Sequence, residues 1–165
     1  MVLLAASLAL VAVVPSTAAG ESYSIFSQLK NSRVKHRYLY SSLFTEHYDP
    51  DPDHVNDQNL LGLETQMEND RLWGFAFFDN SFGQDSQYLY VGRKFRAFGS
   101  DYWNFKLTGG LLHGYKEPYE DKIPLNDLGV APAIIPGIGY QNKHVAVEFV
   151  QLGLAAGMVT FGFVF

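Results

Sequence analysis

Apolar and polar residues alternate with a period of two from Arg37 to the C-terminus, in segments separated by polar turns. In residues 102–113 one face carries Trp103, Phe105, Leu107 and Leu111, and the other carries Asn104, Lys106 and Thr108. This is the period of a β-strand whose two faces meet different environments. The alternation predicts strands at residues 37–48, 59–68, 71–80, 86–98, 102–113, 130–141, 144–151 and 157–165.

Eight strands of about ten residues are the size of the smallest outer-membrane barrels. The connections at 68–71, 98–101 and 142–143 are short, and those at 48–58, 80–87 and 114–129 are longer. The last strand ends on an aromatic residue, Phe165. A soluble β-sandwich that ends in an apolar strand is the alternative. We predict an all-β fold, an eight-stranded antiparallel outer-membrane β-barrel over residues 37–165, with the ends of the first, third and fifth strands at the extracellular rim.

The N-terminus has a different pattern. Residues 1–14 are nearly all apolar and are followed by small residues up to Ala19, which predicts a secretory signal peptide over residues 1–19. An N-terminal membrane helix is the alternative, but this apolar run is too short to cross about 30 Å of hydrocarbon. Residues 20–36 form either a short amphipathic helix at a membrane surface or a disordered leader.

The composition of the chain excludes several classes of functional site and partner. The chain of 165 residues has no cysteine, which excludes a disulfide scaffold, a thiolate metal site and a cysteine nucleophile. A net charge of −5 argues against a nucleic-acid partner. The mean hydropathy of −0.04 argues against a helical membrane protein. Export without cysteine is typical of the envelope of a Gram-negative bacterium.

Candidate chemistry lies in three segments at the expected extracellular rim: residues 47–54, 78–83 and 114–124. His47 and Ser81 have the residue types of a general base and a nucleophile, or of a base and an oxyanion donor. A solvated rim histidine is the plainer interpretation. The Asp-Pro repeat at 49–53 is either a stiff exposed loop or a weak Ca²⁺ site, and it lacks the glycine and distal glutamate of an EF-hand loop. We predict no metal and no cofactor.

These features together resemble the lipid A palmitoyltransferases (the PagP family). In that family a histidine ends the first strand, as His47 does here, and an Asp-Ser pair followed by an aromatic residue ends the third. The corresponding residues here are Asn80-Ser81-Phe82, so an amide replaces the family's carboxylate. Gly92 stands at the spacing of the glycine at the floor of the family's acyl pocket. Residues 123–125 and 136–140 and the aromatic last strand extend the resemblance over residues 37–165.

The resemblance implies a monomeric outer-membrane enzyme that moves a palmitoyl or similar chain from a phospholipid to lipid A. It implies His47 as the base, Ser81 as nucleophile or oxyanion donor, Asn80 in support and Gly92 as the pocket floor. Asp49 or Asp79 could supply the missing charge. Lys116 and Lys122 are candidates for lipid A phosphate contacts, with solvated loop charges as the alternative.

A barrel that holds a hydrocarbon chain needs an apolar interior. A regular first strand would place His47 on one face with Leu39 and Leu43, and Gly92 shares a face with Tyr88 and Tyr90. Pro132 and Pro136 lack the N–H that a strand ladder uses, so they could open a lateral entrance or simply begin a strand. A non-enzymatic structural or binding barrel and a lipid A deacylase remain the alternative functions.

Overall fold

Eight antiparallel strands close into a single barrel in which every strand pairs with its neighbours in the sequence, and the first pairs with the last. The computed structural model describes residues 25–49, 52–55 and 59–165. The strands are β1 (Val34–His47), β2 (Leu60–Met67), β3 (Arg71–Asp79), β4 (Asp85–Arg96), β5 (Trp103–His113), β6 (Val130–Gln141), β7 (Val145–Leu152) and β8 (Ala156–Val164). The predicted barrel is confirmed, and each predicted strand lies within three residues of the observed bounds. The first begins at Val34 rather than at Arg37.

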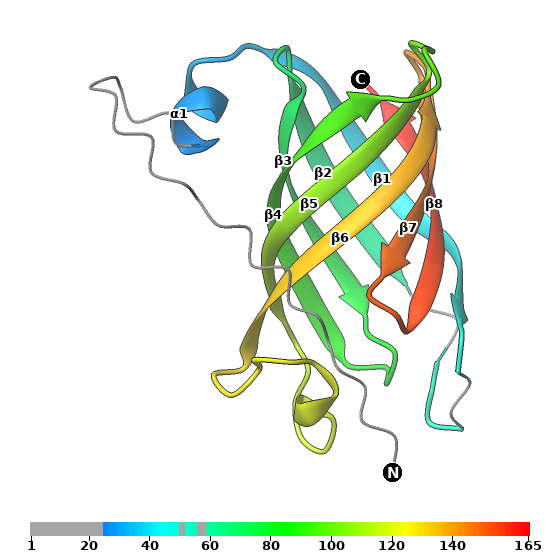
Figure 1. The fold of residues 1–165 in the computed structure, drawn as a ribbon. Coiled ribbons are helices and arrows are strands. Elements are labelled where there is room, and N and C mark those ends of the chain that lie inside the picture. Colours follow the sequence, from blue (N-terminus) through cyan, green and yellow to red (C-terminus); the bar gives the residue numbers. More distant parts are fainter. Residues whose placement is uncertain (1–24, 50–51, 56–58) are drawn as a thin grey trace.

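Two ends of the barrel are distinguished by what they carry (Figure 1). The end with the C-terminus and helix α1 (Ile25–Lys30) is here called the terminal end, and the end with the long connections 48–59 and 114–129 is called the loop end. A single 3₁₀ turn, η1 (Glu120–Lys122), lies in the longer of these loops. Among the described residues, no helix is long and apolar enough to cross a membrane.

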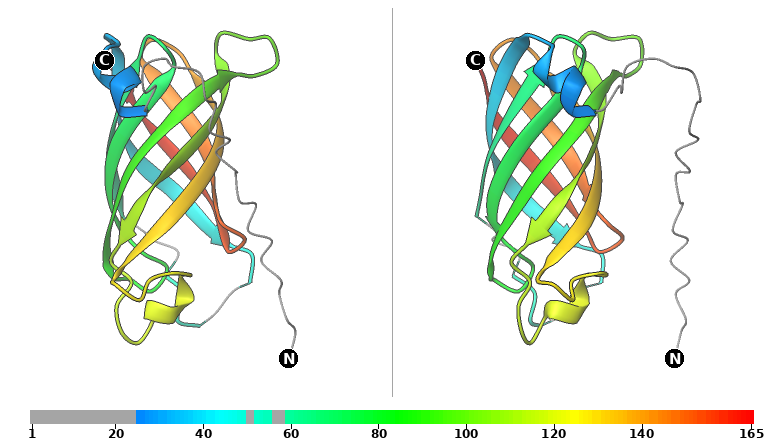
Figure 2. Two further views of the ribbon diagram at one scale, coloured as in Figure 1. Left: turned by 60° about the vertical axis from the view of Figure 1, so that its left-hand side comes forward. Right: turned by 90° about the vertical axis from the view of Figure 1, so that its left-hand side faces the viewer.

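Helix α1 lies outside the barrel wall, beside the turn between β2 and β3 (Figure 2). The Asn69 side-chain amide in this turn donates a hydrogen bond of 3.1 Å to the backbone carbonyl of Gln28. Residues 20–36 were expected to be either a short helix or a disordered leader; within this range Ile25–Lys30 form a short helix, and residues 34–36 already belong to β1. The predicted signal peptide, residues 1–19, lies outside the described residues.

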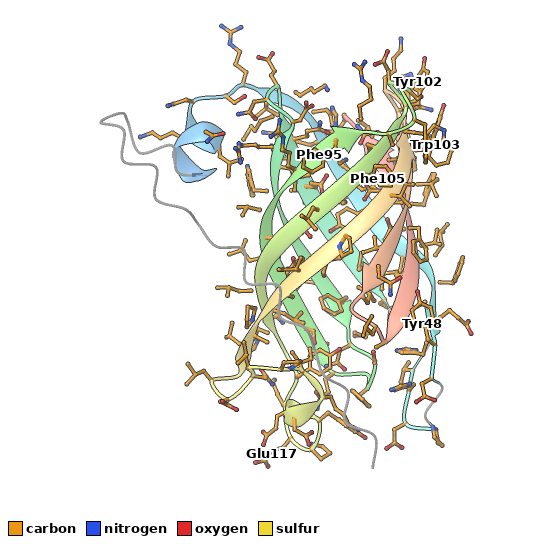
Figure 3. All side chains as sticks on the ribbon, in the orientation of Figure 1. Tyr48, Phe95, Tyr102, Trp103, Phe105 and Glu117 are labelled. Carbon is orange, nitrogen blue, oxygen red and sulfur yellow. The ribbon has the colours of Figure 1, made fainter. Side chains whose placement is uncertain are left out.

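The outer surface of the barrel is apolar. Large side chains that point outward are strongly exposed on every strand, for example Leu61 (58%), Leu89 (54%) and Ile134 (72%). Phe95, Tyr102, Trp103 and Phe105 lie on the outside near the terminal end (Figure 3). An apolar band with aromatic residues towards its edge is the surface that a transmembrane barrel presents to lipid.

The terminal half of the interior holds four charged side chains, here called the charge cluster: Glu64, Lys94, Lys106 and Glu148. Lys94 Nζ lies 3.1 Å from Glu64 and 3.4 Å from Glu148. Lys106 Nζ lies 3.0 Å from Glu64 and also forms an ion pair with Glu148. Each lysine therefore bridges both glutamates, and all four side chains are buried because the pairing offsets their charge.

A layer of tyrosines lies on the loop side of the charge cluster. The rings of Tyr88 and Tyr90 are stacked with centroids 4.9 Å apart. Tyr90 donates a hydrogen bond to Glu64, with an O–O distance of 3.2 Å, so the tyrosine layer is bonded to the charge cluster on its terminal side. Tyr88 donates to the backbone carbonyl of Ala133 at 3.2 Å.

Beyond the tyrosines, towards the loop end, most inward-facing side chains are apolar, and Thr45, His47 and Ser86 are polar exceptions. Several of the apolar side chains are only half-buried. We call this set of half-buried apolar side chains the outer chamber: Leu60, Phe78, Leu112, Ala133, Ile135, Val150 and Leu152. The apolar interior expected from the sequence is present in this half.

A β-bulge in β1 decides which way His47 points. The register with β8 shifts between Ser42 and Phe44, so Leu43 is an extra residue. Such a residue reverses the inward and outward alternation of the rest of its strand. Before the bulge Tyr38 and Tyr40 point inward, and after it Thr45 and His47 do.

The expectation that His47 shares a face with Leu39 and Leu43 is therefore wrong. Leu39 is 41% exposed and Leu43 is 61% exposed on the outer surface, whereas His47 is only 4% exposed and faces the interior. The period of two holds on each side of the bulge but not across it.

Candidate functional site

His47 and Ser81 meet at the loop end of the barrel, as the sequence predicted for the rim. His47 is the last residue of β1, and Ser81 follows β3 in the connection to β4. His47 Nε2 lies 2.8 Å from Ser81 Oγ, which is the distance of a direct hydrogen bond. A histidine nitrogen in this position can accept the hydroxyl proton of the serine.

Asn80 builds the turn that presents Ser81. Its side-chain oxygen accepts hydrogen bonds from the backbone N–H groups of Phe82 at 2.9 Å and Gln84 at 3.1 Å. Its side-chain nitrogen donates to Gln84 Oε1 at 3.3 Å. Asn80 is 1% exposed, so the amide is a fixed part of the turn. It supports the pair through the backbone of the serine turn.

The segment 52–55 covers the pair from one side. Val55 N–H donates to the carbonyl of Ser81 at 2.8 Å, which ties this loop to the serine turn. The ring of His54 is stacked on that of His47, with centroids 4.3 Å apart and an interplanar angle of 25°. His54 also meets the ring of Phe82 edge-on at 5.2 Å.

The loop between β5 and β6 closes the site from the other side. The ring of Tyr119 is stacked on Phe82 with centroids 4.0 Å apart. Tyr115 is hydrogen-bonded to Ser81; burial raises the pKa of its hydroxyl, and the bond to Ser81 acts in the opposite direction. Tyr115 therefore keeps its proton at neutral pH and is available as a donor.

The two candidate lysines lie in this same loop. Lys122 Nζ lies 5.8 Å from the centroid of the Phe82 ring, next to the site. The side chain of Lys116 is exposed, and its backbone N–H donates to Gln84 Oε1 at 3.0 Å. Both belong to a loop that contacts the serine turn.

The candidate carboxylates differ in position. Asp79 accepts a hydrogen bond of 2.9 Å from the Asn59 side chain, so it is directed to β2. Asp49 is exposed. Asp53, beside His54, accepts from the Tyr119 hydroxyl at 3.5 Å, a contact that links two of the rim loops.

Gly92 faces the interior on the same side of β4 as Tyr88 and Tyr90, as the alternation predicted, but its surroundings are tight. It pairs with Leu72 on one side and Thr108 on the other. A Cβ atom there would lie 2.4 Å from the carbonyl oxygen of Leu107. The missing side chain is thus required by a close backbone approach. The role of Gly92 as pocket floor stays a prediction.

Strand pairing is incomplete at two places in the loop half of the wall. The β6–β7 ladder begins only at Gly137, so residues 130–136 of β6, which include Pro132 and Pro136, are paired with β5 alone. The β1–β2 ladder ends at Tyr40 and Gly62, although β1 continues to His47. The two prolines therefore lie along an edge where the wall is not hydrogen-bonded to its next strand.

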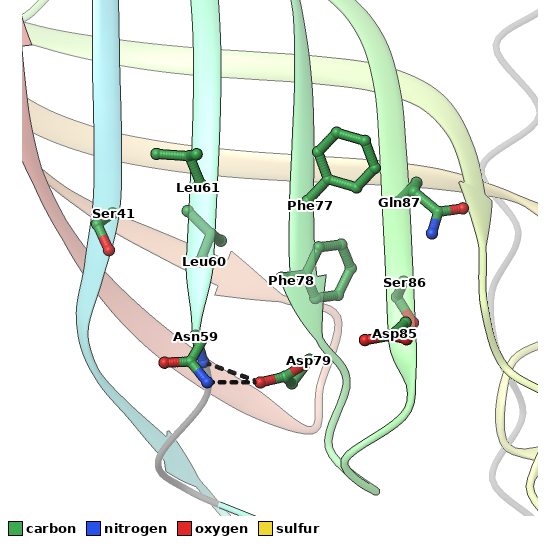
Figure 4. A pocket seen from close by; sticks show the side chains of 10 residues that line it. All are labelled: Ser41, Asn59, Leu60, Leu61, Phe77, Phe78, Asp79, Asp85, Ser86 and Gln87. Atoms are coloured by element: carbon green, nitrogen blue, oxygen red, sulfur yellow. Dashed lines mark hydrogen bonds between the residues drawn. The ribbon is translucent and has the colours of Figure 1, made fainter.

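A groove of about 460 Å³ lies on the wall formed by β1–β4, beside the place where β1 and β2 separate (Figure 4). Apolar side chains, among them Leu61 and Phe77, lie towards the barrel middle. Asn59, Asp79 and Asp85 lie towards the loop end, where Asn59 is hydrogen-bonded to Asp79. Within the described part of the chain, no cluster of three or more histidine, aspartate or glutamate residues could hold a metal ion.

Comparison with known proteins adds the class of the fold. No family model matches the chain, and no curated protein matches it. A designed transmembrane β-barrel is similar in structure, with a TM-score of 0.53 and 13% identity over 81% of this chain and 96% of that one. The fold is that of a transmembrane β-barrel. Ail, the attachment invasion locus protein of Yersinia pestis, also matches, with a TM-score of 0.42 and 15% identity over 79% of this chain and 96% of that one.

Sequence reasoning found His47, Asn80 and Ser81 but assigned no role to His54, Phe82, Tyr115 or Tyr119. All four lie within the three rim segments that the sequence singled out. The available sequence signal was His54 itself, a second histidine seven residues after His47 in the same rim segment. Its stacking on His47 depends on how the loop folds back, which a pattern of residue types does not encode.

Proposed function

We propose that this transmembrane β-barrel is an outer-membrane acyltransferase, which transfers an acyl chain from a phospholipid to lipid A with His47 and Ser81 as its reacting pair. The observation that carries the proposal is the 2.8 Å contact between His47 Nε2 and Ser81 Oγ at the loop end of a barrel whose loop half has half-buried apolar side chains inside. We take the loop end as the extracellular end of the barrel. The His47–Ser81 pair then faces the leaflet of the outer membrane that contains lipid A.

The outer chamber suits the acyl chain. Each CH₂ group that moves from water to an apolar site contributes about 0.8 kcal/mol, so a chamber of fixed depth discriminates between chains that differ by a few methylenes. The tyrosine layer lies on the terminal side of these side chains and limits how deep a chain reaches, so Gly92 acts as the floor only if Tyr88 and Tyr90 move aside. The lateral edge at Pro132 and Pro136 gives a chain in the membrane a route through the wall.

Two reaction routes can transfer the acyl chain with His47 and Ser81. In the first, His47 Nε2 takes the Ser81 proton, and Ser81 Oγ attacks the ester carbonyl of the phospholipid. The lysophospholipid leaves with the proton from His47, and an acyl-serine remains. A lipid A hydroxyl then gives its proton to His47 and attacks the acyl-serine, which releases Ser81 with its proton restored.

In the second route no acyl-serine forms. The lipid A hydroxyl gives its proton to His47 and attacks the phospholipid ester directly, while Ser81 and Tyr115 donate hydrogen bonds to the developing oxyanion. The proton on His47 passes to the leaving lysophospholipid. Lys116 and Lys122 are the cations of the neighbouring loop that would hold lipid A phosphates. An acyl-serine that accumulates when the acceptor reacts slowly would show that the first route operates, because the second route forms none.

A non-enzymatic barrel is the second candidate function. The similarity to a designed transmembrane β-barrel is compatible with it, because a designed barrel takes this fold without an evolved active site. Under this interpretation the rim contacts shape the loops and bind no substrate.

The experiment is a mass spectrum of lipid A from cells with and without the gene. A gain of one acyl chain supports acyl transfer. Loss of a chain would instead identify a deacylase, and an unchanged spectrum in cells with correctly inserted protein would favour the non-enzymatic barrel.

A further inference from the structure

We propose that His54 is a positioning residue for the acyl transfer: its ring, stacked on His47 and supported by Phe82, fixes the plane of the His47 ring so that Nε2 faces Ser81. This rests on the proposed function. It adds a residue to the site that neither the sequence patterns nor the comparisons assign.

The geometry of the two histidines supports the assignment. Their rings are nearly parallel, 25° apart, at a centroid distance of 4.3 Å. Two such rings in face contact restrict rotation of each other about the bond that joins ring and Cβ. This restriction favours the contact with Ser81, because a rotated imidazole would carry Nε2 away from the hydroxyl that lies 2.8 Å from it.

His54 is itself held in place from two directions. Its backbone neighbour Val55 donates to the Ser81 carbonyl at 2.8 Å, which ties the backbone beside His54 to the serine turn. Its ring meets Phe82 edge-on, and Phe82 is stacked on Tyr119 from the β5–β6 loop. Three loops therefore contribute to a continuous row of rings, His47–His54–Phe82–Tyr119.

This row explains how a site made of loop residues can be rigid. Catalytic groups displaced by about 1 Å lose up to about a hundredfold in rate, so a base at the end of a strand needs support from residues around it. A hydrogen-bonded carboxylate often gives such support to a catalytic histidine. Here the Asn80 amide is hydrogen-bonded within the serine turn, and the stacked ring of His54 orients the base.

The test compares His54→Ala, His54→Phe and wild-type protein, each folded into detergent micelles and assayed for acyl transfer from phospholipid to lipid A. We expect His54→Ala to lower kcat by about tenfold to a hundredfold with little change in KM, because the base is misplaced while substrate binding is intact. His54→Phe keeps the ring without its nitrogens and is expected to retain kcat within about threefold. His144→Ala, at an exposed histidine of the terminal end, is the control and is expected to match wild type.

A second readout does not need activity. NMR of ring-labelled histidine should show cross-relaxation between the two rings in the wild-type protein. The ring-current displacement of the His47 signals should persist in His54→Phe and disappear in His54→Ala. Retained activity in His54→Ala, or a His54→Phe variant as slow as His54→Ala, would overturn the assignment; the second result would mean that the nitrogens of His54 act.

The experiments distinguish a failure of the proposed function from a failure of the role assigned to His54. If wild-type protein transfers no acyl chain, that function is wrong, and the NMR result alone decides whether His54 orients His47. Absence of the ring contact in the NMR spectra would refute the assignment whatever the activity.

Discussion

Removing one lysine from the charge cluster should destabilise the barrel far more than removing a cation from its surface. The change is Lys106→Met, which keeps the length of an apolar side chain and deletes the ammonium group. Glu64 and Glu148, which are 1% and 2% exposed, would then share Lys94 alone. Loss of one partner from a buried ion pair leaves an uncompensated charge away from water, and the expected loss of unfolding free energy is about 3–5 kcal/mol.

Two further variants show whether charge balance is the cause. Lys106→Met combined with Glu148→Gln restores one positive and one negative charge, Lys94 with Glu64, and should recover most of the loss. Arg96→Met deletes the cation of a pair with Asp101 whose side chains are 68% and 76% exposed, with N and O 2.8 Å apart. An exposed pair of this kind contributes about 0–1 kcal/mol, so this control should hardly differ from wild type.

The assay is reversible unfolding by denaturant in detergent micelles, followed by tryptophan fluorescence from Trp73 and Trp103 and by the shift in gel migration between folded and unfolded barrel. The midpoints give the differences in free energy if the slopes agree. A loss for Lys106→Met no larger than that for Arg96→Met would refute the reasoning. So would a double variant less stable than the single one.

Three further changes test the interior wall and the rim. Gly92→Ala should destabilise the barrel by about 1–3 kcal/mol in the same assay, because its Cβ would meet the Leu107 carbonyl, and a variant as stable as wild type would contradict this contact. Asn80→Ala removes three hydrogen bonds within the serine turn and should lower stability by about 1–3 kcal/mol together with transfer activity; unchanged activity would remove the turn from the mechanism. Tyr88→Ala should deepen the outer chamber and shift donor preference to longer acyl chains in a competition between phospholipids, whereas an unchanged preference would place the chamber floor elsewhere.

The fold was predictable from sequence because the alternation is strong and local. Leu107 outward and Lys106 inward, or Phe149 outward and Glu148 inward, follow from the period of two alone. The charge cluster was not foreseen, since Glu64 and Lys106 are 42 residues apart and come from strands on different sides of the barrel. Which inward charges meet depends on strand tilt and register, and neither can be read from a single strand.

The candidate site was predictable in its residues but not in the strand that presents His47. His47 and Ser81 were chosen from their places at two strand ends, and the structure brings them together. The alternation nevertheless put Leu39 and Leu43 on the face of His47, whereas both leucines face outward, because nothing in the sequence marks Leu43 as an extra residue. Without this bulge the side chain of His47 would point to lipid, so the bulge is part of the site.

The most direct test of the proposed acyl transfer uses purified protein in micelles with lipid A and a phospholipid labelled in one acyl chain. We predict that the label moves to lipid A with wild-type protein and that Ser81→Ala, folded as judged by gel migration, leaves it on the phospholipid. Label that stays on the phospholipid with folded wild-type protein, or that moves equally well with Ser81→Ala, would contradict the assignment of this pair as the reacting groups of an acyltransferase.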